Sequence, residues 1–309
     1  MTSIRPLRTL SAHPSRVSAL AYSPGGDSIA CGYQDGGVVS WDVATGKPRT
    51  TYAEYVTFYT DFILSVAYSP DGALLVATNL GYYPARRERA VYIWRTIDKT
   101  LAYTLGGFRY QVYAVAFTSD GTLLAVGGDD STVKLYDVQS GEECGPTLPR
   151  LPYSVSSLAF RPRSRLLVAG CDGCEMRLWN LDAGAEERTI EGHVEWTSAL
   201  AFHPSGSILA SGGEDGAIIL WDAATAQRIR EVRSDNVWGD WVTSLAFNPR
   251  GTLLASASAE RVVELWDTGT SERVTVVQHA GVRSVAFSPH GALLASGGND
   301  GVKLWQIGQ

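Results

Sequence analysis

Hydrophobic and polar residues follow a pattern along this chain that repeats seven times. Each repeat opens with alternating small and large apolar residues and a turn rich in Ser, Pro and Gly, as in residues 199–206 (ALAFHPSG) and 284–291 (SVAFSPHG). A second apolar segment, a turn rich in Gly and Asp, and a third segment ending near an aromatic residue follow. These aromatic residues lie 39 to 53 residues apart and are Trp41, Trp94, Tyr136, Trp179, Trp221, Trp266 and Trp305. Such a period predicts an array of one structural unit that cannot bury its apolar residues alone.

Residues 197–222 illustrate the unit. The first predicted strand ends at Pro204-Ser205-Gly206, because Pro fixes φ and Gly accepts a positive φ. The second strand covers residues 207–211, and the third covers residues 217–221, which are β-branched and aromatic as strands prefer. In residues 228–232 charged residues are interspersed with Ile229 and Val232, and this half-polar pattern is typical of an exposed strand. The unit is therefore predicted to be a four-stranded antiparallel sheet with three buried strands and one outer strand.

The buried strands are apolar on both faces, so each sheet must be covered on both sides. Sheets that stack side by side around an axis satisfy this requirement, and radial repetition leaves only short, protected edges. We therefore predict an all-β fold in which residues 1–309 form a single seven-bladed β-propeller of four-stranded antiparallel blades.

The last repeat ends soon after Trp305 and has no room for an outer strand. Residues 7–13 (LRTLSAH) match residues 187–193 (ERTIEGH), which lie at the outer strand of another repeat. We therefore expect residues 4–12 to complete the seventh blade and close the ring. Burial of Leu7 and Leu10 is expected to stabilise this closure by about 1.5–3 kcal/mol each.

The composition agrees with this predicted fold. The 309 residues are 45% hydrophobic and 19% charged, as in soluble globular proteins. No apolar run is long enough to cross a membrane, and the first residues lack the features of a secretory signal, so we expect a cytoplasmic protein. The net charge of −6 argues against a nucleic-acid partner, because binding to nucleic acid requires basic residues.

The four cysteines, Cys31, Cys144, Cys171 and Cys174, are too few for a disulfide framework in a chain of this length. Cys171 and Cys174 have the spacing of half a zinc site, but no second pair of Cys or His has matching spacing. Cys171 falls where other repeats carry Gly or Ser, which favours a small buried residue. We expect no metal and no cofactor.

Three repeats carry Trp-Asp at residues 41–42, 221–222 and 266–267, and Gly192-His193 precedes one inner strand. With seven repeats in register, the chain resembles the WD-repeat β-propellers over its whole length. In that family a His, a Ser or Thr, an Asp and a Trp of one blade form a hydrogen-bonded tetrad. The resemblance implies structural tetrads in the fifth and seventh blades, made of His193, Ser211, Asp215 and Trp221, and of His279, Ser296, Asp300 and Trp305.

The other blades depart from this tetrad. Cys31 stands at the hydroxyl position of the first blade. At the Asp position, the fourth blade has Gly173 and the sixth has Glu260, and the third blade has Asp130 without its His. Each net hydrogen bond contributes about 0.5–1.5 kcal/mol. With only two complete tetrads, we expect strand burial to hold the ring together and the His and Asp residues to be structural, not catalytic.

In such a sheet, the turn after the second strand and the connection into the first lie at the same end. In the fifth and sixth blades this end gathers three tryptophans beside acidic residues, namely Trp196, Trp238 and Trp241 with Glu195 and Asp240. Two interpretations stay open. The tryptophans either pack together as the core of the loops or form an aromatic, acidic surface for a cationic side chain of a partner.

The second blade has an insertion, residues 79–89, at the same end, which contains Tyr82, Tyr83, Arg86 and Arg87. Tyr59 and Phe62 lie in the preceding connection, and Arg16 precedes the inner strand of the first blade. The insertion is either neutral drift or a recognition loop, whose basic residues would suit an acidic segment of a partner.

Two functions are weighed. The first is a non-catalytic scaffold, monomeric as a domain, that binds protein or peptide partners on this face. The alternative is a propeller hydrolase, lactonase-like or sialidase-like, acting at the central channel. The predicted inner strands contain no Asp or Glu, and Arg283 is their only charge before the turn, so no acid/base pair is visible. No local catalytic motif is present either, which favours the scaffold.

Overall fold

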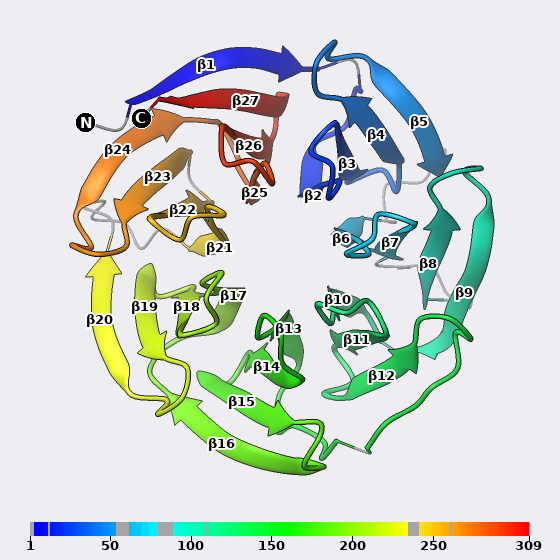
Figure 1. Cartoon of the computed structure of the whole chain (residues 1–309), viewed down its shortest axis with the longest axis vertical. Helices are drawn as coiled ribbons and strands as arrows, with labels where there is room; N and C mark the ends of the chain where they lie inside the picture. The colour runs from blue at the N-terminus through cyan, green and yellow to red at the C-terminus, as the bar shows by residue number, and fades with distance from the viewer. Residues whose placement is uncertain are drawn as a thin grey trace.

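The computed structural model describes residues 3–11, 13–53, 62–79, 89–108, 110–146, 148–233, 241–259 and 261–308. Its sheets stand around a central axis as the seven blades of a propeller (Figure 1). The predicted fold is therefore confirmed. Among the described residues no helix is long and apolar enough to cross a membrane.

Each blade runs outward from an inner strand next to the axis. Blades one to four contain β2 (Val17–Tyr22), β3 (Ser28–Tyr33), β4 (Val38–Asp42) and β5 (Pro48–Ala53); β6 (Ile63–Tyr68), β7 (Leu74–Asn79), β8 (Arg89–Arg95) and β9 (Leu101–Phe108); β10 (Val112–Phe117), β11 (Leu123–Gly128) and β12 (Val133–Asp137); and β13 (Val155–Phe160), β14 (Leu166–Cys171), β15 (Glu175–Asn180) and β16 (Ala185–Glu191). Blades five to seven contain β17 (Thr197–Phe202), β18 (Ile208–Gly213), β19 (Ala217–Asp222) and β20 (Arg228–Arg233); β21 (Val242–Phe247), β22 (Leu253–Ser258), β23 (Val262–Asp267) and β24 (Arg273–Gln278); and β25 (Ser284–Phe287), β26 (Leu293–Gly298), β27 (Gly301–Gly308) and β1 (Ser3–Leu10).

Six sheets have four strands, but the sheet of blade three has three in the described part of the chain. An isolated bridge between Tyr136 and Glu143 stands where the outer strand of other blades begins. The residues that follow include Pro146, Pro149 and Pro152. The N–H of Cys144 still donates to Leu135 O of β12 at 2.8 Å. Proline cannot donate to a strand ladder, so the described residues after it do not continue as a strand beside β12.

The N-terminal strand closes the ring, as predicted. β1 pairs antiparallel with β27, and the two ends of the chain lie side by side (Figure 1). Leu10 is 1% exposed, but the predicted burial of Leu7 is wrong, because its side chain is 51% exposed. The pairing register shifts between Pro6 and Arg8, and Leu7 is the extra residue of this β-bulge. The bulge turns its side chain away from the core.

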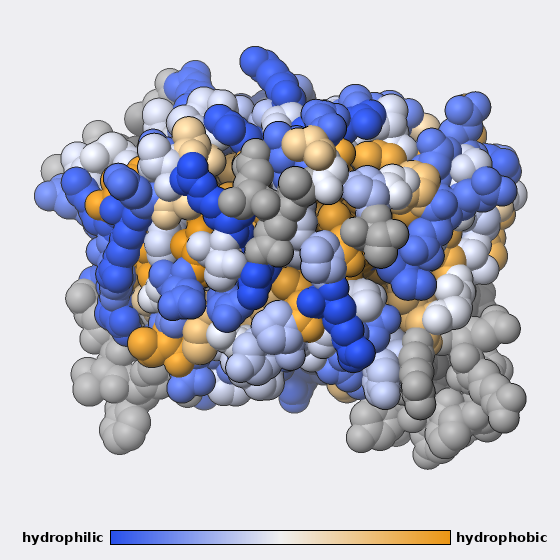
Figure 2. All heavy atoms as spheres, turned by 90° about the horizontal axis from the view of Figure 1, so that it is seen from below, coloured by the Kyte–Doolittle hydropathy of each residue, from blue (hydrophilic) through white to orange (hydrophobic). Residues whose placement is uncertain are grey.

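The core is divided among the blades. Seven clusters of buried apolar residues each join two neighbouring blades. Val17 and Leu20 of blade one, for example, belong to one cluster with Val302 and Leu304 of blade seven. Each sheet is thus covered on both faces, and hydrophilic side chains are interspersed with apolar ones over the rim (Figure 2).

Candidate interaction site

The loops that enter the inner strands and the turns between the second and third strands form one end of the propeller, here called the loop face. In five blades the two loops are joined by a hydrogen bond to the carbonyl just before the inner strand. The backbone N–H of Glu214 donates to Trp196 O at 2.9 Å, and that of Ala259 donates to Trp241 O at 3.0 Å. Gln34 makes the same bond to Arg16 in blade one. The two kinds of loop therefore form one surface.

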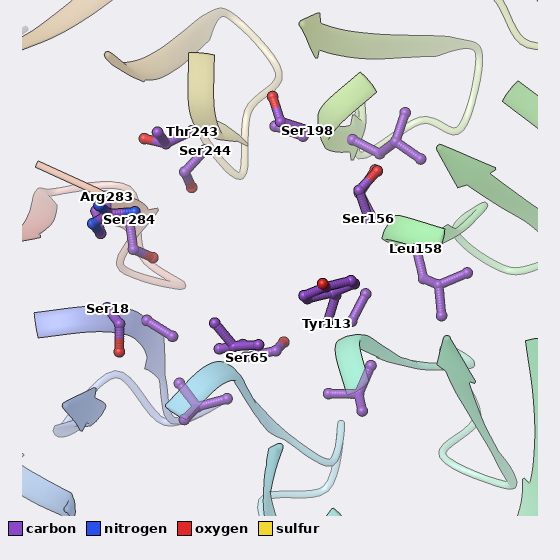
Figure 3. Close-up of a pocket in the computed structure, with 18 of the residues that line it drawn as sticks. Ser18, Ser65, Tyr113, Ser156, Leu158, Ser198, Thr243, Ser244, Arg283 and Ser284 are labelled. Carbon is purple, nitrogen blue, oxygen red and sulfur yellow. The ribbon is translucent and has the colours of Figure 1, made fainter. Parts of the chain in front are cut away.

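A cavity of about 220 Å³ lies on the axis, between the inner strands (Figure 3). Hydroxyl groups line much of it, and several connect neighbouring blades. Ser156 Oγ donates to Gly170 O at 3.0 Å in its own blade or to Thr197 O at 2.6 Å in the next. Ser18 and Ser198 bond in the same way to their own second strand and to the next inner strand. Thr243 bonds to its own second strand and to Val282 O, just before β25.

The cavity offers little for acid/base catalysis. The described residues that line it include no carboxylate and no imidazole, and Arg283 is the only charged residue among these described residues. The hydroxyls of Ser18, Ser156, Ser198 and Thr243 are engaged with backbone carbonyls, so none of them is paired with a base that would activate it as a nucleophile.

Aromatic side chains are exposed on the loop face over blades four to six. Trp196 is 47% exposed, Trp241 is 53% exposed and Tyr153 is 48% exposed. Glu195 and Val194 beside Trp196 are also exposed. The structure thus places Trp196, Trp241 and Glu195 at the surface. Tyr153 was not singled out from the sequence. A Cβ at Gly173 would collide with its ring, so the ring occupies the position of the tetrad Asp in this blade.

Three half-buried carboxylates lie in adjacent blades, each at the first residue after the second strand, and they are Asp129, Asp172 and Glu214. Burial raises the pKa of Asp172, and the nearby charge of Asp129 raises it further, against a hydrogen bond from Ser154. Burial likewise raises the pKa of Glu214, as do the charges of Asp172 and Glu195. Asp172 therefore lies close enough to both Asp129 and Glu214 for the like charges to repel each other. Their shared register position was the sequence signal that could have found them.

The remaining predicted contact residues are divided. Arg16 is exposed on the loop face, and Phe62 is half-buried there. The others lie outside the described residues, namely Tyr59, Tyr82, Tyr83, Arg86, Arg87, Trp238 and Asp240.

The four residues expected to form the tetrad of blade five are brought together. Trp221 Nε1 donates to Ser211 Oγ at 2.8 Å, and Ser211 Oγ lies 2.8 Å from His193 Nε2. His193 Nδ1 lies 3.1 Å from Asp215 Oδ1. Burial alone would raise the pKa of Asp215, but hydrogen bonds from His193 and from the backbone N–H of Val194 and Ala217 hold it at about 2. All four side chains are therefore occupied within the blade.

Blade seven has the same connections with the imidazole nitrogens exchanged. Trp305 Nε1 donates to Ser296 Oγ at 2.8 Å, and Ser296 Oγ lies 2.7 Å from His279 Nδ1. His279 Nε2 lies 2.7 Å from Asp300 Oδ1, and Lys303 Nζ lies 2.9 Å from Asp300 Oδ2.

In blade one the buried indole N–H has a different hydrogen-bond acceptor. Cys31 stands where blades five, six and seven have Ser, and Trp41 Nε1 donates instead to the hydroxyl of Tyr33 at 2.9 Å. The ring of His13 stacks on Tyr33 with a centroid distance of 3.7 Å. Sequence reasoning missed Tyr33, although its place at the end of the second strand, where blade five has Gly213, was visible.

Tyr33→Phe is expected to lower the free energy of unfolding by about 1–3 kcal/mol, because it leaves the buried Trp41 N–H without its acceptor. Urea unfolding followed by tryptophan fluorescence measures this change. Tyr22→Phe is the matched control, because the buried Tyr22 hydroxyl has no hydrogen-bond partner among the described residues. Equal effects of the two substitutions would contradict the role of Tyr33.

Metal-binding residues are not clustered in the described part of the chain, where no group of three or more His, Cys, Asp or Glu residues is arranged to hold a metal ion. Cys171 is fully buried at the end of β14.

The sequence pattern described as "WD domain, G-beta repeat" matches six segments that together cover more than half of the chain, residues 4–42, 99–137, 146–180, 184–222, 232–267 and 271–306. The chain belongs to the WD-repeat family. In this WD-repeat protein four of the matched segments, residues 4–42, 99–137, 184–222 and 271–306, run from the outer strand of one blade to the third strand of the next. The inner three strands of blade two lie outside them, in the repeat with the longest spacing.

Three relatives show how far the similarity extends. The chain is 30% identical over 131 residues to "Meiotic recombination protein rec14" of Schizosaccharomyces pombe, covering 42% of this chain and 40% of the relative. It is 26% identical over 136 residues to "Guanine nucleotide-binding protein subunit beta" of Arabidopsis thaliana, covering 43% and 34%. It is 27% identical over 130 residues to "Chromatin assembly factor 1 subunit FAS2 homolog" of Oryza sativa subsp. japonica, covering 41% and 24%. The matches thus span less than half of each relative.

Proposed function

We propose that this WD-repeat protein is a non-catalytic scaffold, monomeric as a unit, that binds a protein or peptide partner on the loop face over blades four to six. The observation that carries this proposal is the gathering of half-exposed aromatic side chains there, at Tyr153, Trp196 and Trp241. Tryptophan and tyrosine are the residues that most often dominate the energy of protein interfaces.

The charges beside these aromatic residues favour a cationic side chain of the partner. Asp172 and Glu214 are half-buried and repel their acidic neighbours, so a cation placed among them would relieve that repulsion. A cation over an exposed indole such as Trp196 gains up to about 2 kcal/mol when it is partly desolvated. We therefore propose that a Lys or Arg of the partner lies between the aromatic side chains and these carboxylates.

The relatives support binding rather than catalysis. Two of them are named as subunits, one of a guanine nucleotide-binding protein and one of a chromatin assembly factor, so their names describe parts of assemblies. The central cavity adds to this support. The described residues of its lining include no carboxylate or imidazole, and hydroxyls such as that of Ser156 bond to the neighbouring blade.

Affinity capture from lysate of the source cells, read by mass spectrometry, tests the proposal. Trp196→Ala combined with Trp241→Ala is expected to weaken the specific partners by about 100-fold or more, because each hot-spot residue contributes about 2 kcal/mol. Ile97→Ala combined with Ile229→Ala is the matched control, because these apolar residues are 90% and 51% exposed but lie away from the loop face.

Partners that are retained by the wild type and the control but lost by the tryptophan variant would support the site. An unchanged set of partners would remove blades five and six from the interface. If the wild type retained no partner, the scaffold proposal would fail, and a screen for hydrolase activity would follow.

A further inference from the structure

The second residue of each inner strand faces the central cavity, and in most blades it serves the ring. Ser18, Ser156, Ser198 and Thr243 hold this position in blades one, four, five and six. Each uses its hydroxyl to join its own blade to the next. In blade seven the register places Arg283 here, and its side chain makes no such hydrogen bond.

Arg283 is exposed in the cavity, and its guanidinium makes no hydrogen bond or ion pair with any described residue. Figure 3 shows it on the opposite side of the cavity from Tyr113, with Ser244 and Ser284 on its own side. Blade seven thus has an arginine in place of the hydroxyl that joins other blades to their neighbours. The positive charge of this arginine is not balanced by any described carboxylate. A charge that replaces a structural contact and has no partner among the described residues points to a ligand of opposite charge.

Two hydroxyls near this charge are able to donate. Ser284 Oγ accepts from the backbone N–H of Leu20 at 3.2 Å, and Ser244 Oγ accepts from that of Val285 at 3.2 Å. Neither hydroxyl proton has an acceptor among the described residues, so both remain available. A guanidinium with hydroxyl donors beside it matches the two oxygens of a carboxylate.

We propose that the cavity binds a carboxylate group on Arg283, with Ser244 and Ser284 as further donors. A carboxylate carries one negative charge, which one guanidinium balances. A phosphate group carries about −1.5 to −2 at neutral pH and would retain excess charge in a cavity with a single cation. The space, about 220 Å³, holds several waters, so it has room for a carboxylate with a short side chain.

This site differs from the proposed partner surface in place and in charge. The aromatic side chains and carboxylates of the loop face lie over blades four to six and select a cation. Arg283 lies in blade seven and selects an anion. Failure of one proposal therefore leaves the other standing.

Two-dimensional ¹H–¹⁵N NMR of the whole protein, titrated with sodium acetate against sodium chloride at equal ionic strength, tests the site. We expect saturable shifts at Arg283, Ser244 and Ser284 with acetate alone. Arg283→Ser is expected to weaken acetate binding by about 10- to 100-fold, the contribution of a hydrogen bond to a charged group. Arg283→Ser also places a hydroxyl at the position where four other blades have one, so the variant protein should melt at or above the wild-type temperature.

Arg5→Ser is the matched control, because Arg5 is an exposed arginine that bonds to Gln306 on the rim. It should bind acetate as the wild type does. No saturable shift up to 100 mM acetate, or equal binding by Arg283→Ser, would overturn the proposal. Stronger binding of inorganic phosphate than of acetate would overturn the choice of a carboxylate.

The source of the carboxylate is tested with a short alanine peptide in two forms. If the ligand is the end of a polypeptide, the peptide with a free C-terminal carboxylate should bind more tightly than acetate, and the amidated form should not bind. If the free peptide binds more weakly than acetate, the site takes a small carboxylate instead. Binding of the amidated form at Arg283 would contradict both.

Discussion

Deletion of residues 1–12 is expected to leave the protein insoluble or to lower its thermal midpoint by several degrees. β1 supplies the outer strand of blade seven and pairs with β27 from Ser3↔Gly308 to Leu10↔Val302. Without it, the edge of β27 is bare, and such an edge pairs readily with other chains. The loss of buried Leu10 alone removes about 1.5–3 kcal/mol.

Sedimentation and a thermal melt of the truncated chain measure this effect, and two point variants separate burial from strand pairing. Leu10→Ala should cost about 2–5 kcal/mol, because it opens a cavity in the cluster that joins blades one and seven. Leu7→Ala, on the exposed bulge, should cost no more than about 0.5 kcal/mol. A truncated chain that melts at the full-length temperature would refute closure of the ring by the N-terminal strand.

The exposure of Leu7 shows where hydrophobic periodicity stops being informative. Both Leu7 and Leu10 are apolar residues of a strand, and alternation cannot detect an inserted residue. Similar shifts of register occur in the outer strands β16, β20 and β24, which bulge opposite Trp179, Trp221 and Trp266 of the third strands. These bulges follow from backbone pairing in the folded ring, so the pattern of side chains alone does not reveal them.

In blade three the sequence did contain the relevant signal, but the repeat pattern led to the prediction of a fourth strand. The prolines at 146, 149 and 152 argue against a paired strand, whereas the period of the array favours one. In the described part of the structure the prolines decide the outcome, because no fourth strand pairs with β12. The segment covers β12 with Leu148 and Leu151, which pack on the cluster between blades three and four.

The candidate interaction site was partly visible in the sequence. Trp196 and Trp241 stand out because they precede an inner strand, where no apolar residue is required. Asp172 and Glu214 do not stand out, because acidic residues are ordinary in turns of this kind. Their register position, which they share with Asp129, is the one sequence signal of this cluster. The ring brings the carboxylates together, and their burial and the repulsion between neighbours then distinguish them from other turn residues.

The tetrad of blade seven leads to the second prediction, a loss of stability on mild acidification. His279 is fully buried, and burial lowers its pKa to about 4, although the nearby Asp300 opposes this shift. A neutral ring also suits its contacts, because the Ser296 hydroxyl accepts from Trp305 and can donate its own proton to His279 Nδ1. Protonation of that nitrogen would remove the acceptor that Ser296 uses.

The direction of the effect follows from linkage. In the unfolded chain a histidine has a pKa near 6.5, so between pH 6.5 and 4 the unfolded state binds a proton at this position that the folded state does not. The free energy of unfolding therefore falls as the pH falls through this window. The difference between a pKa of about 6.5 and one of about 4 corresponds to about 3 kcal/mol in the free energy of unfolding. This stability is fully present above pH 6.5 and is lost as the pH falls to 4.

Urea unfolding at a series of pH values between 4 and 7.5 measures this loss, and His279→Gln tests its origin. The variant is expected to be less stable than the wild type at pH 7.5, because it disturbs the contacts with Ser296 and Asp300, but its stability should fall less steeply with acid. His290→Gln removes an exposed imidazole from the opposite end of the propeller and should keep the steep wild-type curve. If His279→Gln lost stability with acid as steeply as the wild type, the buried imidazole of blade seven would not be the acid-sensitive group of the ring.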